Sequence, residues 1–188
     1  MPGYIKSLLT RFQYKPKKKQ YSPHLWQRPI YSKLPSPINE PDLPIVSSKQ
    51  IQYVQQVLGS LLYYAIAVDS TLLVAISELA SIQTKATSLT LNKVSWLLDH
   101  VATNPNVTVT FIASDMQLRA HSEASYFSVP KSKSRAGGHV FLSNSTKPKS
   151  SNHIYTLNGL IAVLCKILKF IMASAAEAEI GAAFLVVQ

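Results

Sequence analysis

Acidic side chains are scarce in this sequence of 188 residues, which has nine Asp and Glu against nineteen Lys and Arg. The formal net charge at pH 7 is therefore +10. This excess indicates a polyanionic partner, and it favours nucleic acid over an anionic membrane surface. Charged residues make up only 15% of the chain and apolar residues 47%, which excludes a disordered composition and leaves enough apolar side chains for a core.

Cysteine is nearly absent as well. Cys165 is the only one, so the sequence excludes an internal disulfide and a cysteine zinc site, and we interpret Cys165 as a core residue. The N-terminus lacks the apolar segment of a secretory signal. The most apolar region, residues 157–187, is interrupted by two lysines and two glutamates, whereas a membrane span needs about 20 predominantly apolar residues. We therefore expect an intracellular protein, cytoplasmic or nuclear, without a membrane partner.

Proline is concentrated near the N-terminus, with seven residues between positions 16 and 44. That density excludes regular structure there, although apolar residues at helical spacing predict a short amphipathic helix over residues 4–13. We expect residues 15–44 to run extended over a neighbouring surface, or equally to form a solvated linker. In the first case the anchors are aromatic (Tyr21, Trp26 and Tyr31), and three lysines are free to touch phosphates (Lys17, Lys18 and Lys19).

Three helices are predicted in the next part of the chain. The first begins at Ser47–Ser48, the second begins near Asp69, and the third runs from about Thr90 to Ala102, each with apolar residues at steps of three and four. Alternating residues over 107–112 then predict a short strand. These features define a helical region from about residue 45 to 113, preceded by a basic proline-rich arm, residues 1–44.

The C-terminal part, residues 114–188, alternates in a way that is typical of strands. We predict strands near 117–127, 138–143 and 160–165 in one antiparallel sheet, a basic turn over 129–136, and a helix over 173–186 packed on the sheet. On the first strand, Ala124 and Tyr126 fall on one face, and Glu123 and Phe127 on the other. The fold class is therefore α/β, of the α+β type. We expect one edge and one apolar face to be uncovered, with the apolar residues of the last strand under-buried (Leu160, Ile161 and Val163), and hence a tendency to self-associate.

Two sets of motifs resemble one family. Ser122-Glu-Ala-Ser-Tyr126 on the first strand and Ala176-Glu-Ala-Glu-Ile-Gly-Ala-Ala183 on the last helix resemble the ribonuclease H domain of copia-like retrotransposon Pol polyproteins. Val57-Leu-Gly-Ser-Leu-Leu-Tyr-Tyr64 and Lys93-Val-Ser-Trp-Leu-Leu98 resemble the connection between reverse transcriptase and ribonuclease H. The resemblance implies an incomplete ribonuclease H-like mixed sheet with one packed helix. It also implies an ancestral activity that hydrolyses the RNA strand of RNA–DNA hybrids.

In the family, an acid on the first strand and an acid on the first helix help to hold two magnesium ions. The resemblance assigns these metal-binding and catalytic roles to Glu123 and Glu179, with Mg²⁺ or Mn²⁺ as cofactor if the site is completed. Glu123 departs from the family, which has Asp there, and the family's later acids would follow Gln188. Two carboxylates are too few for two octahedral ions, so we expect no cleavage by this chain alone.

A second hypothesis needs no catalytic geometry. The basic turn offers Lys131, Lys133 and Arg135, interspersed with serines, to the phosphates of an RNA–DNA hybrid, so the chain is alternatively a non-catalytic nucleic-acid-binding remnant. Its other expected partners are the rest of a Pol polyprotein or further copies of itself. A solvated basic loop, or an inert remnant of a decayed element, remains a third interpretation.

Overall fold

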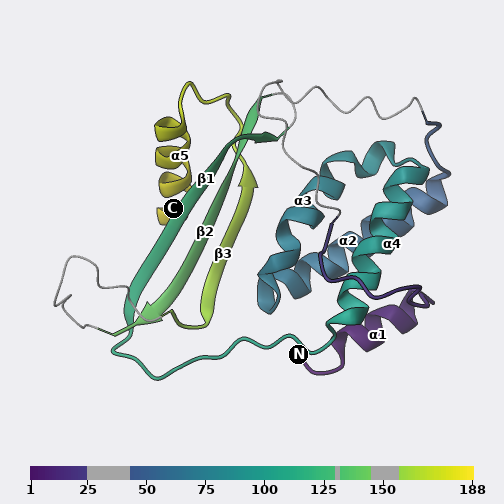
Figure 1. Cartoon of the computed structure of the whole chain (residues 1–188), viewed down its shortest axis with the longest axis horizontal. Helices are drawn as coiled ribbons and strands as arrows, with labels where there is room; N and C mark the ends of the chain where they lie inside the picture. The colour runs from purple at the N-terminus through teal and green to yellow at the C-terminus, as the bar shows by residue number, and fades with distance from the viewer. Residues whose placement is uncertain (25–42, 130–131, 145–156) are drawn as a thin grey trace. The chain divides into compact units, whose positions relative to one another are not determined.

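The computed structural model describes residues 1–24, 43–129, 132–144 and 157–188. It divides the chain into a helical unit, which ends at Thr108, and a sheet unit, which begins at Val109 (Figure 1). Together the two units have the α+β composition that the sequence predicts. The division lies before the one expected at residues 113–114, and the described N-terminal residues 1–24 belong to the helical unit rather than to a separate arm. Among the described residues, no helix is both long and apolar enough to cross a bilayer.

The described residues of the helical unit form four α-helices and two 3₁₀ turns. They are α1 (Tyr4–Arg11), α2 (Ser48–Ala67), η1 (Ser70–Leu72), α3 (Leu73–Ile82), η2 (Gln83–Lys85) and α4 (Ser88–Thr103). The predicted helices are therefore confirmed, except that α1 ends two residues before the predicted end. Its core is aliphatic and lies where the helices meet, with fully buried residues from α2, η1 and α4 (Val54, Val57, Leu61, Leu72, Val94, Leu97 and Leu98).

Polar side chains determine where these helices begin. Ser47 and Gln50 form a reciprocal capping box at the start of α2, and Thr87 and Thr90 form one at the start of α4. The carboxylate of Asp69 accepts from the Thr71 N–H at the start of η1. Each cap satisfies N–H groups that have no partner inside the helix, which stabilises each start by about 1 kcal/mol.

The sheet unit has the predicted order of strands and helix. It consists of β1 (Gln117–Val129), β2 (Lys133–Ser143), β3 (Leu160–Ile167) and α5 (Ala175–Val187). The strands form one antiparallel sheet in the order β1-β2-β3, with Ala124 opposite Ala136 and Gly138 opposite Leu164. The prediction of an antiparallel sheet with a packed helix is confirmed.

Helix α5 lies against one face of the sheet through small side chains (Figure 1). Ala178 and Ala182 are fully buried there against Ala136 and Leu168. A Cβ atom at Gly138 would collide with the side chain of Val186, so glycine lets the helix approach the strand closely.

The opposite face of the sheet is centred on Phe141, which is fully buried. The ring centroids of His121 and His139 each lie 5.1 Å from its own. Burial, followed by the neighbouring His121, lowers the pKa of His139. On β3, Ile161 is 50% exposed while Leu160 and Val163 are half-buried, which agrees with the expectation that this strand is under-buried.

Three local predictions are wrong. Residues 107–112 form no strand, and the N–H and C=O of Ile112 bond the Asn158 side chain. The turn after β1 does not extend to residue 136, because Lys133 already pairs with Val129. The alternation of β1 breaks at Phe127, where φ is +50° and the register with β2 shifts. Simple alternation therefore does not place the Phe127 ring on the same face as Glu123, as the sequence predicted.

Candidate nucleic-acid interface

Residues 14–22, which we call the N-terminal strap, lie along α4 of the helical unit. The Tyr14 hydroxyl and the Lys17 backbone N–H both donate to Oδ1 of Asp99, each over 2.9 Å. Asp99 is only 2% exposed. Burial and the bond to this carboxylate raise the pKa of Tyr14, so its hydroxyl stays protonated and continues to donate.

Three further bonds fix the second half of the strap. The Gln20 N–H donates to Oγ1 of Thr103 over 2.9 Å, and Nδ1 of His100 bonds the Gln20 carbonyl over 3.1 Å. The Trp96 indole donates to the Ser22 carbonyl over 2.9 Å. Asp99 and Thr103 are four residues apart, as are Trp96 and His100, so all four side chains lie on neighbouring rows of one helix surface. The strap backbone is therefore held at Lys17, Gln20 and Ser22.

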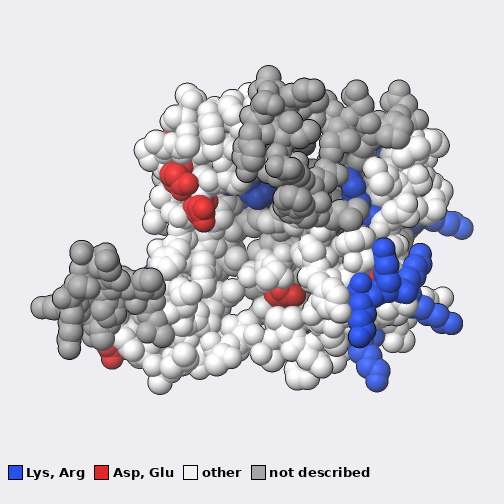
Figure 2. Space-filling model, in the orientation of Figure 1, with Lys and Arg blue, Asp and Glu red and all other residues white. Residues whose placement is uncertain are grey.

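The strap presents a row of lysines to solvent. Lys15, Lys17, Lys18 and Lys19 are all exposed. The Lys18 ammonium lies 4.7 Å from the centre of the Trp96 ring, a cation–π contact that orders this side chain more than its neighbours. Figure 2 shows Lys and Arg gathered over α1 and the strap.

Few negative charges of the helical unit oppose this row. Its described residues contain nine Lys and Arg, namely Lys6, Arg11, Lys15, Lys17, Lys18, Lys19, Lys49, Lys85 and Lys93. They contain three acids, Asp69, Glu78 and Asp99. Asp69 and Asp99 are buried, at 4% and 2% exposure. The surface of the unit is thus strongly cationic, and most of the charge lies in its first 19 residues.

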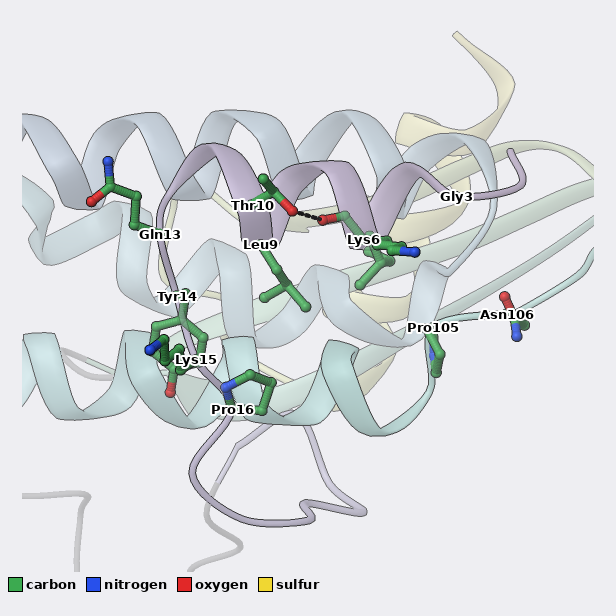
Figure 3. A pocket seen from close by; sticks show the side chains of 11 residues that line it. Gly3, Lys6, Leu9, Thr10, Gln13, Tyr14, Lys15, Pro16, Pro105 and Asn106 are labelled. Atoms are coloured by element: carbon green, nitrogen blue, oxygen red, sulfur yellow. Dashed lines mark hydrogen bonds between the residues drawn. The ribbon is translucent and has the colours of Figure 1, made fainter.

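Two hollows adjoin the lysine row, and Pro16 lines both. The first, of about 660 Å³, lies between α1, the start of the strap and the residues that follow α4 (Figure 3). Lys6 and Lys15 lie at this hollow beside Leu9 and Pro105. The second, of about 510 Å³, is lined by Lys17, Lys18, Lys19, Tyr21 and the end of α4. Each hollow combines lysines with uncharged walls and no acid.

The sequence located part of this surface. It singled out Lys17, Lys18 and Lys19, and it predicted an extended segment over a neighbouring surface. Tyr21 is 80% exposed and is not an anchor, while Trp26 and Tyr31 lie outside the described residues. The anchor that the sequence missed is Tyr14. The available signal was Asp99, a charged residue that directly follows the apolar pair Leu97 and Leu98 and is buried with them.

The basic turn of the sheet unit offers less. Lys131 lies outside the described residues, and Lys133 is half-buried in β2. Arg135 is only 8% exposed, and its Nη1 donates to Sγ of Cys165 over 3.7 Å. Its guanidinium therefore lies on the sheet rather than on an open turn, and a phosphate contact by Lys131, Lys133 and Arg135 stays a prediction.

The two carboxylates with expected metal roles lie near the free edge of β1. Oε2 of Glu179, on α5, accepts from the Ala124 backbone N–H over 3.0 Å. Glu123 precedes Ala124 in the strand, and Ala124 packs toward α5. Because neighbouring strand residues point to opposite faces, the Glu123 side chain projects from the face that α5 does not cover. Glu179 therefore bonds the backbone next to Glu123, but the Glu123 side chain lies on the face of the sheet opposite α5.

These residues do not fit a two-metal site as they stand. One Glu179 oxygen already accepts an N–H, and the described residues contain no group of three or more His, Cys, Asp or Glu placed to hold a metal ion. Glu177 is exposed and caps α5: its carboxylate accepts from the Ala173 N–H, and its own N–H donates to Ser174 Oγ. These residues therefore support no catalytic step through a metal.

Comparisons with known proteins found no family model, no curated protein and no solved structure that matches this chain.

Proposed function

We propose that the chain binds nucleic acid through the lysines of the N-terminal strap and does not cleave it. The observation that carries this proposal is the fixed strap backbone, with its N–H and C=O groups bonded to side chains of α4. The strap keeps adjacent lysines exposed on one surface. A lysine that contacts a phosphate releases a condensed counterion, and this release supplies most of the affinity of non-specific binding.

The fixed backbone strengthens the argument beyond net charge. A flexible lysine-rich tail must lose chain entropy when it aligns with a phosphate backbone, whereas a segment already held in place loses less. The carboxylate of Asp99 fixes the strap and is itself buried, so it contributes little surface charge that would repel phosphates. The arrangement favours a polyanion over a single small anion, because the lysines follow one another along the segment.

The first test removes two strap lysines together. Lys17→Ser with Lys19→Ser should weaken binding to a labelled oligonucleotide about tenfold at 0.1 M salt, measured by fluorescence anisotropy. The slope of log K against log salt should fall by about 1.4 to 1.8, since each lost phosphate contact removes about 0.7 to 0.9. Lys18 is left in place because it packs on Trp96.

The matched control is Lys49→Ser with Lys85→Ser, which removes the same charge from exposed lysines of the helical unit that line neither hollow. It should lower the affinity less than threefold. Equal losses in the two variants would mean that net charge alone binds the polyanion. Binding to vesicles that contain phosphatidylserine, without binding to nucleic acid, would also overturn the proposal.

Ribonuclease H-like cleavage, in a segment of a copia-like Pol polyprotein, is the second candidate. The bond from the Ala124 N–H to Glu179 supports it, because it brings the acid of the helix beside the acid-bearing strand. Glu123 and Glu179 would be ligands for Mg²⁺ or Mn²⁺ in one site only if both carboxylates came to the same face of the sheet and further carboxylates joined them. We expect the chain alone to bind an RNA–DNA hybrid without cutting it.

The cleavage test incubates the chain with a hybrid and Mg²⁺ or Mn²⁺, and follows the RNA strand on a denaturing gel. The expected result is intact RNA with the chain and with the variants Glu179→Gln and Glu177→Gln. Metal-dependent cleavage that disappears in Glu179→Gln and persists in Glu177→Gln would contradict our expectation and would establish a catalytic role for Glu179.

A further inference from the structure

An exposed aromatic ring lies at the end of the lysine row. The Tyr21 side chain is 80% exposed, yet its neighbours Gln20 and Ser22 are both bonded to α4. The backbone on each side of Tyr21 is thus fixed while its ring extends into solvent. Tyr21 also lines the second hollow beside Lys17, Lys18 and Lys19. An aromatic ring in this position adds little to the core of the helical unit and is available to a ligand.

The first hollow provides an apolar surface beside Lys15, the first lysine of the row. Leu9, Pro16 and Pro105 line it together with Lys6 and Lys15. In Figure 3 the Leu9 side chain points from α1 toward the start of the strap, and Gln13 points away from it. A flat heterocycle packs well on such a surface, since its faces are apolar and only its edges form hydrogen bonds. Pro16 lines both hollows, so a ligand that follows the strap over this residue would come near each of them.

We infer that the preferred ligand of the strap is single-stranded nucleic acid, with its phosphates on the lysines and one base stacked on Tyr21. This inference rests on the proposed nucleic-acid binding and specifies its ligand. In a duplex the faces of the bases are stacked on one another, so Tyr21 would meet only sugar and phosphate. A single strand can turn its bases toward the protein, and stacking on an aromatic ring tolerates every base.

The test compares one mixed sequence as single-stranded DNA, single-stranded RNA, duplex DNA and RNA–DNA hybrid, by anisotropy at fixed salt. Single strands should bind at least about fivefold more tightly than either duplex form. Tyr21→Ala should weaken single-strand binding at least about fivefold, leave duplex binding unchanged and leave the salt slope unchanged. Tyr21→Phe should bind as the original chain does, because it keeps the ring and removes only the hydroxyl.

The lysine variant separates this inference from the proposed function. If Lys17→Ser with Lys19→Ser weakens all four ligands while Tyr21→Ala changes none, the strap binds phosphates and the stacking inference is wrong. Equal affinity for single strands and duplexes would also overturn the inference and leave the proposed function in place. If no nucleic acid binds at low salt, both are wrong.

Discussion

Asp99→Leu is expected to release the N-terminal strap from α4 and to destabilise the helical unit by about 3 kcal/mol. The carboxylate accepts from the Tyr14 hydroxyl and from the Lys17 N–H, and leucine leaves both donors without that partner. The site is 2% exposed, so water cannot readily replace the lost acceptor. Urea denaturation followed by circular dichroism at 222 nm, where the helices dominate the signal, measures the change.

The same variant also tests the proposed function against simple electrostatics. Asp99→Leu removes a negative charge, so net charge alone predicts tighter binding of a polyanion. If the fixed strap matters, binding should instead weaken about tenfold, because the lysines must be ordered at the moment of binding. Asp99→Asn is the matched control, since it makes the same change in charge but keeps an oxygen acceptor. Tighter binding by both variants would show that the strap need not be held in place.

The helices of this chain are predictable because their signals are local. Ser47 with Gln50 is a capping box in the sequence as well as in the structure, and the apolar steps of α2 and α4 mark the buried faces. The alternation of β1 up to Ser125 is likewise local, since the pleat of a strand is read from neighbouring residues alone. These features required no knowledge of which elements meet.

The strap could be predicted only in outline, because its bonds join residues about 80 positions apart. Tyr14 and Asp99 are both ordinary polar residues in the sequence, and nothing local indicates that they meet. The proline-rich composition predicted no regular structure, as is found in its described residues 15–24, but it could not distinguish an ordered segment from a solvated linker. The strap is ordered because side chains of α4 form hydrogen bonds with the N–H and C=O groups of its backbone.

The carboxylate pair shows a second limit of sequence reasoning. Matching to a family motif placed Glu123 and Glu179 in one site, but the face on which a strand residue lies depends on what packs against its neighbour. Ala124 contacts the α5 layer, so Glu123 projects from the other face of the sheet. A motif fixes residue types and spacing, whereas the packing of α5 decides which side chains can converge.

Phe141→Ala is expected to have the largest effect on the sheet unit, a loss of about 3 to 5 kcal/mol. The ring is fully buried and lies between His121 and His139, so alanine leaves a cavity bordered by polar rings. Within residues 109–129, 132–144 and 157–188 the unit has a three-stranded sheet and one helix, and few other side chains there are fully buried. A loss of this size is comparable to the whole stability of a small domain.

Hydrogen exchange of backbone amides, measured by mass spectrometry on peptides that cover β2, provides the readout. The protection of these amides should fall at least about a hundredfold, since about 1.4 kcal/mol corresponds to a factor of ten, while peptides from α2 and α4 keep theirs. Phe170→Ala is the matched control, because that ring is 76% exposed, and it should change protection little. Because the bond between Glu179 and the Ala124 N–H requires α5 to remain on the sheet, exchange at Ala124 should rise with that of β2. If Ala124 stayed protected after β2 had opened, α5 and β1 would form a stable unit without the rest of the sheet, contrary to the packing described above.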